Sequence, residues 1–65
     1  MHVRKDNRMI PKDPAMLLSF INMRLRDYGI RFDALCEDLG VERSEVEAAL
    51  ATIDYYYNEE QNRFV

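Results

Sequence analysis

Residues 34–50 have the apolar spacing of a helix-turn-helix, in which two short helices pack across a tight turn. The turn falls at Gly40, with the small residue Cys36 four positions before it and Val46 six positions after it. Four further apolar residues complete the inner face: Leu35, Leu39, Val41 and Leu50. This spacing constrains the fold more than any other feature, because it requires two helices that approach each other closely beside Cys36.

Capping residues place one longer helix before this motif. Asp13 is a good N-cap, Pro14 suits the first helical turn, and Gly29 can adopt the left-handed conformation that ends a helix. The first helix of the motif is expected to begin near Asp33, as its N-cap, and to end at Leu39. These positions predict two helices separated by a short connection.

The third helix is expected over roughly residues 43–53. Ser44 followed by Glu47 forms a capping box, and Glu42 with Glu45 is an alternative start. Beyond this helix the pattern becomes strand-like, so the helix must end before the run of tyrosines.

The C-terminal end has the pattern of a β-hairpin. Residues 54–57 are strand-like, residues 58–62 form a polar turn, and residues 63–65 can return as a second strand. Three helices followed by a hairpin is the order of a small winged-helix-like domain. We therefore predict a mainly α, helix-turn-helix-like fold with a short C-terminal β-hairpin, formed by residues 13–65 as a single domain.

The length of 65 residues limits how such a domain can be stabilised. A single core of this size rarely supplies more than about 3–5 kcal/mol, so the chain needs good packing or a partner subunit. Cys36 is the only cysteine, which excludes an internal disulfide. His2 and Cys36 are too few soft ligands for a zinc site, and no metal or cofactor is expected.

The charges divide the chain into two parts. Residues 1–12 hold four basic side chains against one acidic side chain, a charge of +3, and are expected to form a flexible basic leader. Residues 13–65 hold five basic side chains against eleven acidic ones, a charge of −6. Met9 is an alternative start, so residues 1–8 are either native or an extension. Without an apolar signal or a membrane-spanning run, the expected location is the cytoplasm.

The first helix has more apolar surface than one core face needs. At about 100° per residue, one stripe should face the core: Leu17, Leu18, Ile21, Leu25 and Tyr28. A second stripe beside it contains Met16, Phe20 and Met23. This second stripe either packs under the hairpin or contacts another chain. The small size of the domain favours packing, whereas methionine and phenylalanine are typical of adaptable interfaces.

No pattern of catalytic residues is present. A nucleophilic cysteine needs a base and a lowered pKa, but Glu37 and Asp38 follow Cys36, and the only histidine lies in the leader. We interpret Cys36 as the small packing residue that lets the two helices approach. No phosphate-binding loop or distinctive carboxylate pair appears, and an enzyme is not expected.

Nucleic-acid binding is the alternative that the helix-turn-helix pattern raises. A recognition helix reads bases with its N-terminal residues, which here offer Arg43 and Ser44 as candidate contacts. Glu42, Glu45 and Glu47 surround them and would repel phosphates. An atypical DNA-binding regulator therefore remains the second hypothesis, with nucleic acid an improbable partner.

A protein interface is the leading hypothesis. On a strand, Tyr55 and Tyr57 share one face and Tyr56 points the other way. One face should pack on the first helix with Phe64, and the other is then half-exposed. Tyr56 and the second stripe of the first helix are thus the candidate interface. We predict a non-enzymatic protein–protein interaction module, expected to be a homodimer through that stripe or the tyrosine hairpin.

Four segments resemble a small uncharacterised bacterial family, the domain of unknown function 4250. They are IPKDPAMLLS at residues 10–19, LRD at residues 25–27, DALCEDL at residues 33–39 and NEEQNRFV at residues 58–65. The resemblance covers residues 10–65 and leaves residues 1–9 outside the pattern. It implies a bacterial cytoplasmic protein and brings no activity, cofactor or catalytic residue.

Overall fold

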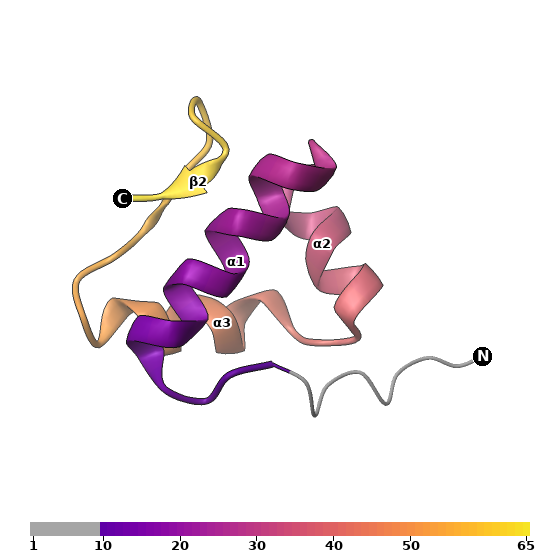
Figure 1. The fold of residues 1–65 in the computed structure, drawn as a ribbon. Coiled ribbons are helices and arrows are strands. Elements are labelled where there is room, and N and C mark those ends of the chain that lie inside the picture. Colours follow the sequence, from indigo (N-terminus) through magenta and orange to yellow (C-terminus); the bar gives the residue numbers. More distant parts are fainter. Residues whose placement is uncertain (1–9) are drawn as a thin grey trace.

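Three helices and a short antiparallel hairpin follow one another in a computed structural model that describes residues 10–65 (Figure 1). The elements are α1 (Pro14–Tyr28), α2 (Phe32–Leu39), α3 (Arg43–Ala51), β1 (Tyr57–Asn58) and β2 (Arg63–Phe64). This order confirms the predicted mainly helical fold with a C-terminal hairpin, and the winged-helix-like description is compatible with it. In residues 10–65 no helix has both the length and the apolar character that a bilayer crossing requires.

Most of the predicted leader lies outside the described residues. Within them, Ile10 is half-buried and packs against the core. Together with Pro11 and Lys12 it lines a shallow groove against α3. Packing against the domain therefore extends at least as far back as residue 10.

Helix α1 begins and ends where its capping residues predict. The Asp13 carboxylate accepts a hydrogen bond of 3.2 Å from the backbone N–H of Met16. At the other end Gly29 has a φ of 67°, and its N–H donates to the carbonyl of Leu25 at 3.0 Å. A side chain is strained at that φ, which is why glycine suits this position.

Helix α2 begins at Phe32, and its N-cap lies two residues before the predicted one. Its N-cap is Arg31, which makes no side-chain capping bond, so the assignment of Asp33 as N-cap is wrong. Burial explains the shift, because Phe32 is completely buried in the core and the first turn forms around it. Asp33 lies in that first turn, and Gly40 ends the helix with a φ of 74°, as predicted.

Helix α3 begins at Arg43, as predicted, but ends before the predicted residue. Glu42 occupies the N-cap, which is the alternative start, although it makes no side-chain capping bond. Ser44 lies inside the helix, so the capping box of Ser44 with Glu47 is wrong. Glu47 instead accepts a hydrogen bond from Arg43. The helix ends at Ala51 rather than Ile53, because the chain turns through Asp54, whose φ is 63°, toward the hairpin.

The hairpin is shorter than its strand-like residues predict. Tyr57 pairs with Phe64 and Asn58 with Arg63. The backbones of Tyr56 and Val65 extend the ladder by exchanging hydrogen bonds of 3.0 and 2.9 Å. The expected strand at residues 54–55 is absent, because these residues complete the turn that follows α3.

The tip of the hairpin is attached to the helices by Asn62. This residue has a φ of 54°, and its amide donates to the carbonyl of Ile30 at 2.8 Å. Its side-chain oxygen accepts a hydrogen bond from the hydroxyl of Tyr57. The polar turn is therefore held against the α1–α2 connection.

The core lies between α1, the helix-turn-helix and the inner face of the hairpin. Its buried side chains are Leu17, Ile21, Leu25, Phe32, Leu35, Cys36, Val46, Leu50 and Phe64. The rings of Tyr57 and Phe64 lie 5.1 and 5.0 Å from that of Phe32, measured between centroids. Tyr28 is 49% exposed, so its assignment to the core stripe is wrong.

Candidate functional site

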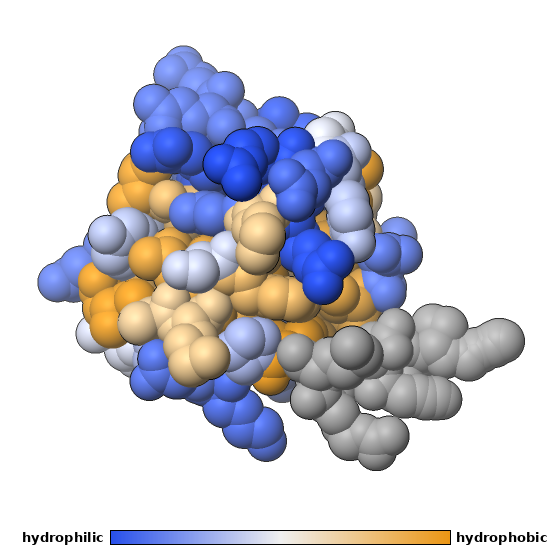
Figure 2. All heavy atoms as spheres, in the orientation of Figure 1, coloured by the Kyte–Doolittle hydropathy of each residue, from blue (hydrophilic) through white to orange (hydrophobic). Residues whose placement is uncertain are grey.

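The apolar stripe, which consists of Met16, Phe20 and Met23, reaches the surface of α1. Met16 is 62% exposed and Met23 is 46% exposed, whereas Phe20 is half-buried and packs against the core. The expectation that domain size would draw the stripe into the core is thus wrong for both methionines. Figure 2 shows apolar side chains gathered on the face where α1 lies and hydrophilic ones over the hairpin tip.

One edge of the apolar stripe is stiffened by Arg24. Its guanidinium lies 4.8 Å from the ring centroid of Phe20 and 5.6 Å from that of Tyr28. It also donates a hydrogen bond of 2.6 Å to the Tyr28 hydroxyl. Because the three residues are spaced four apart on one helix, they stack as a ladder that holds Phe20 in place.

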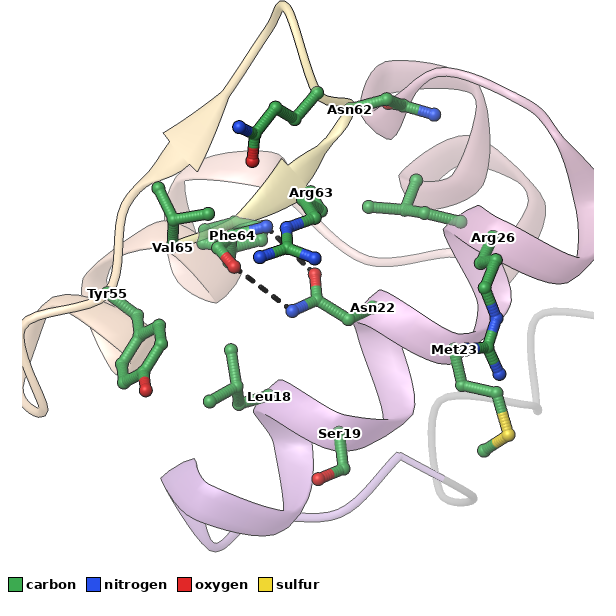
Figure 3. Close-up of a pocket in the computed structure, with 12 residues that line it drawn as sticks. Leu18, Ser19, Asn22, Met23, Arg26, Tyr55, Asn62, Arg63, Phe64 and Val65 are labelled. Atoms are coloured by element: carbon green, nitrogen blue, oxygen red, sulfur yellow. Dashed lines mark hydrogen bonds between the residues drawn. The ribbon is translucent and has the colours of Figure 1, made fainter.

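An open groove of about 770 Å³ separates α1 from the hairpin (Figure 3). We call it the hairpin groove. Its apolar lining includes Leu18, Met23, Tyr55, Phe64 and Val65. Leu18 points toward Tyr55 and Val65 at one end, and Met23 lies farther along α1, where the groove meets the apolar stripe (Figure 3).

Asn22 fixes the position of the hairpin beside this groove. Its side-chain oxygen accepts a hydrogen bond of 2.8 Å from the N–H of Phe64, and its amide donates one of 3.1 Å to the carbonyl of Phe64. In an antiparallel ladder, hydrogen-bonded pairs alternate with pairs that are not hydrogen-bonded. Tyr56 and Val65 form a hydrogen-bonded pair, so the next pair, Tyr57 with Phe64, is not hydrogen-bonded, and the backbone N–H and C=O of Phe64 point away from β1. Asn22 therefore takes the place that a third strand would occupy.

Tyr56 lies apart from the apolar stripe. It is 58% exposed and stands opposite Val65 on the outer face of the hairpin. It also lines a second groove, of about 430 Å³, with Ala48 and Ala51 of α3. The structure thus brings Met16, Phe20 and Met23 together and places Tyr56 on a different surface.

The candidate nucleic-acid contact Arg43 is occupied by contacts within the chain. Its guanidinium donates to Asp33 at 2.7 Å and to Glu47 at 2.9 Å. It also lies 5.0 Å from the ring centroid of Phe32 and 5.3 Å from that of Tyr57. The hydrogen bonds to Asp33 and then Glu47 raise the pKa of Arg43 above its usual range.

The sequence analysis did not predict that Arg43 forms ion pairs within the domain. Its position four residues before Glu47 on one helix is a signal for one of the two ion pairs. Ser44 is exposed and makes no hydrogen bond through its side chain within residues 10–65. The two residues of the nucleic-acid hypothesis therefore differ, because Arg43 stabilises the domain while Ser44 is open to solvent.

Cys36 is buried in the core, which confirms its prediction as a packing residue. Burial raises the pKa of its thiol from 9.0 to about 11, even though the charge of Arg43 nearby opposes the shift. Within the described part of the chain, no three side chains are grouped so as to hold a metal ion. Because the thiol is buried and its pKa is raised, it is poorly suited to nucleophilic chemistry.

We expect Cys36 to react with iodoacetamide at pH 8 roughly a hundred times more slowly than a free cysteine, because two pKa units reduce the thiolate fraction that much. Stability should fall as the pH rises from about 9 to 11, because the thiol of the unfolded chain loses its proton first. Mass spectrometry of labelled protein, with urea-unfolded protein as the control, checks the rate. Rapid labelling of the native protein would contradict the burial argument.

The family model of DUF4250, a domain of unknown function, matches residues 11–64 of this chain. The match spans nearly all of the described residues, and the chain belongs to this family. No curated protein and no solved structure gives a significant match.

Proposed function

We propose that this DUF4250 chain is a non-enzymatic protein-interaction domain that self-associates through the apolar stripe. The observation that carries the proposal is the exposure of Met16 and Met23 beside the half-buried ring of Phe20. Three large apolar side chains on one helical face form a continuous surface that water contacts unfavourably. Covering that surface with a second copy also supports a domain whose own core is small.

A two-fold arrangement of α1 against α1 suits the charges at the two ends of the stripe. In an isologous dimer the same patch meets itself, so antiparallel helices would place Met16 of one copy near Met23 of the other. Exposed Lys12 precedes the stripe and exposed Asp27 follows it. The antiparallel pairing brings these opposite charges toward each other, whereas a parallel pairing brings like charges together.

The nucleic-acid alternative has less support. A phosphate would have to compete with Asp33 and Glu47 for the guanidinium of Arg43. Residues 10–65 also hold eleven carboxylate side chains against six basic ones, so a polyanion is repelled overall. Both observations favour a protein partner.

Replacing Met16 by glutamate should abolish self-association, because the dimer would bury each new carboxylate, without a charge partner, beside Met23 of the other copy. Sedimentation equilibrium at rising protein concentration is expected to show a monomer–dimer equilibrium for the parent chain and a monomer for Met16→Glu. The variant should melt close to the parent temperature measured at low concentration, because Met16 lies outside the core.

Ala34→Glu is the matched control, since it adds the same charge at an exposed position of α2. This control should dimerise like the parent chain. A parent chain that stays monomeric at high concentration, or a Met16→Glu variant that still dimerises, would overturn self-association through the stripe.

A further inference from the structure

The hairpin groove differs in charge from the rest of the domain. Two arginines line it, Arg26 from α1 and Arg63 from β2, and no carboxylate side chain does. Six of the eleven carboxylates in residues 10–65 lie within residues 33–47, on the helix-turn-helix, and α1 carries only Asp27. An acidic domain therefore presents one groove whose charged side chains are all basic.

Both arginines of the groove are available to a ligand. Within residues 10–65 Arg63 forms no ion pair, and Arg26 has only a contact of 3.7 Å to Asp27, with both side chains largely exposed. An exposed pair at that distance contributes little to stability. Arg43, by contrast, is committed to two close carboxylates.

We propose that the hairpin groove binds an acidic segment of a partner protein. Apolar side chains of the segment would pack against Leu18, Tyr55 and Val65, and its carboxylates would pair with Arg26 and Arg63. The groove supplies an apolar end and a basic flank, which is the complement of a segment in which acidic and apolar residues alternate. Figure 3 shows Arg63 and Arg26 on the side of the groove away from Tyr55.

Asn22 makes this groove a preformed site. Its two hydrogen bonds to Phe64 hold β2 at a set distance from α1, so the groove keeps its shape without a ligand. A preformed groove binds more tightly, because no ordering of the hairpin opposes association.

A nucleic acid or an anionic membrane fits the groove less well. A polyanion that followed Arg63 along the hairpin would meet Glu59 and Glu60 at the tip, both exposed. Two cations are also few for phosphate binding, which gains affinity from many such contacts. The apolar lining at Leu18 and Val65 favours side chains over phosphates.

Fluorescence anisotropy with a labelled peptide of alternating glutamate and leucine tests the proposal. We expect saturable binding that weakens as salt is raised, and no comparable binding of the lysine–leucine or glutamate–glycine analogue. The double variant Arg26→Gln, Arg63→Gln should bind at least tenfold more weakly. The double variant Arg26→Lys, Arg63→Lys, which keeps both positive charges in the groove, should retain most of the binding.

Three outcomes would overturn the proposal. They are absence of binding by the glutamate–leucine peptide, unchanged binding by the double arginine variant, and equal or tighter binding of duplex DNA or of phosphatidylserine vesicles through the same arginines. The inference rests on the proposed function only in that the chain acts by binding protein. Met16→Glu should lose self-association and keep the peptide, whereas the arginine variant should do the reverse, so the two failures are distinguishable.

Discussion

Replacing Phe32 by alanine is expected to unfold the domain at room temperature. Phe32 is 0% exposed, and its ring packs edge-on to Phe64 and obliquely on Tyr57. Removing a buried phenylalanine costs about 3–5 kcal/mol, because apolar burial is lost and a cavity is left. A core of this size supplies about the same amount in total, so little or no stability would remain.

The unfolding of Phe32→Ala can be measured by far-ultraviolet circular dichroism during heating. Tyr56→Ala is the matched control, because it removes an aromatic side chain that is 58% exposed. This control should melt within a few degrees of the parent chain, since each kcal/mol moves the midpoint by about 4–8 °C in a domain of this length. A Phe32→Ala variant that melts cooperatively near the parent temperature would contradict the assigned core.

The large contribution of Phe32 to the stability of the domain was not predictable from the helical pattern. Periodicity correctly placed Leu17, Ile21 and Leu25 in the core, because these residues repeat at the spacing of one helical face. Phe32 lies immediately before the predicted start of α2, where no periodic pattern reaches. Its burial depends on the hairpin folding back over α2, which brings Phe64 to it from 32 residues away.

The two candidate surfaces also differ in whether the sequence could predict them. The apolar stripe was visible in the sequence because its residues are neighbours on one helix, although its exposure was not. The hairpin groove was not visible, because Asn22 and Phe64, which define it, are 42 residues apart. Likewise, the sequence offered Arg43 as a DNA contact, and only the fold brings it to Asp33.

Replacing Asn22 by alanine is expected to destabilise the domain by about 1–3 kcal/mol and to release the hairpin locally. The variant leaves the N–H and the carbonyl of Phe64 without their partners in a partly buried setting. Both groups point away from β1, so no strand can replace the lost bonds. The hairpin then keeps its own ladder and the attachment of its tip through Asn62, but β2 loses its hydrogen bonds to α1.

Hydrogen exchange at single amides separates this local release from general unfolding. The Phe64 amide depends on Asn22 alone, so in Asn22→Ala it should exchange many times faster, whereas the Val65 amide, bonded to Tyr56, should lose only the protection that the lower stability removes. Asn22→Asp is the informative comparison, because at neutral pH it keeps an acceptor for the Phe64 N–H but cannot donate to the carbonyl. We expect it to protect the Phe64 amide better than alanine does while still destabilising the hairpin. Equal exchange at Phe64 in the parent and alanine chains would show that Asn22 does not hold β2, and the groove would then lose the contact that preforms it.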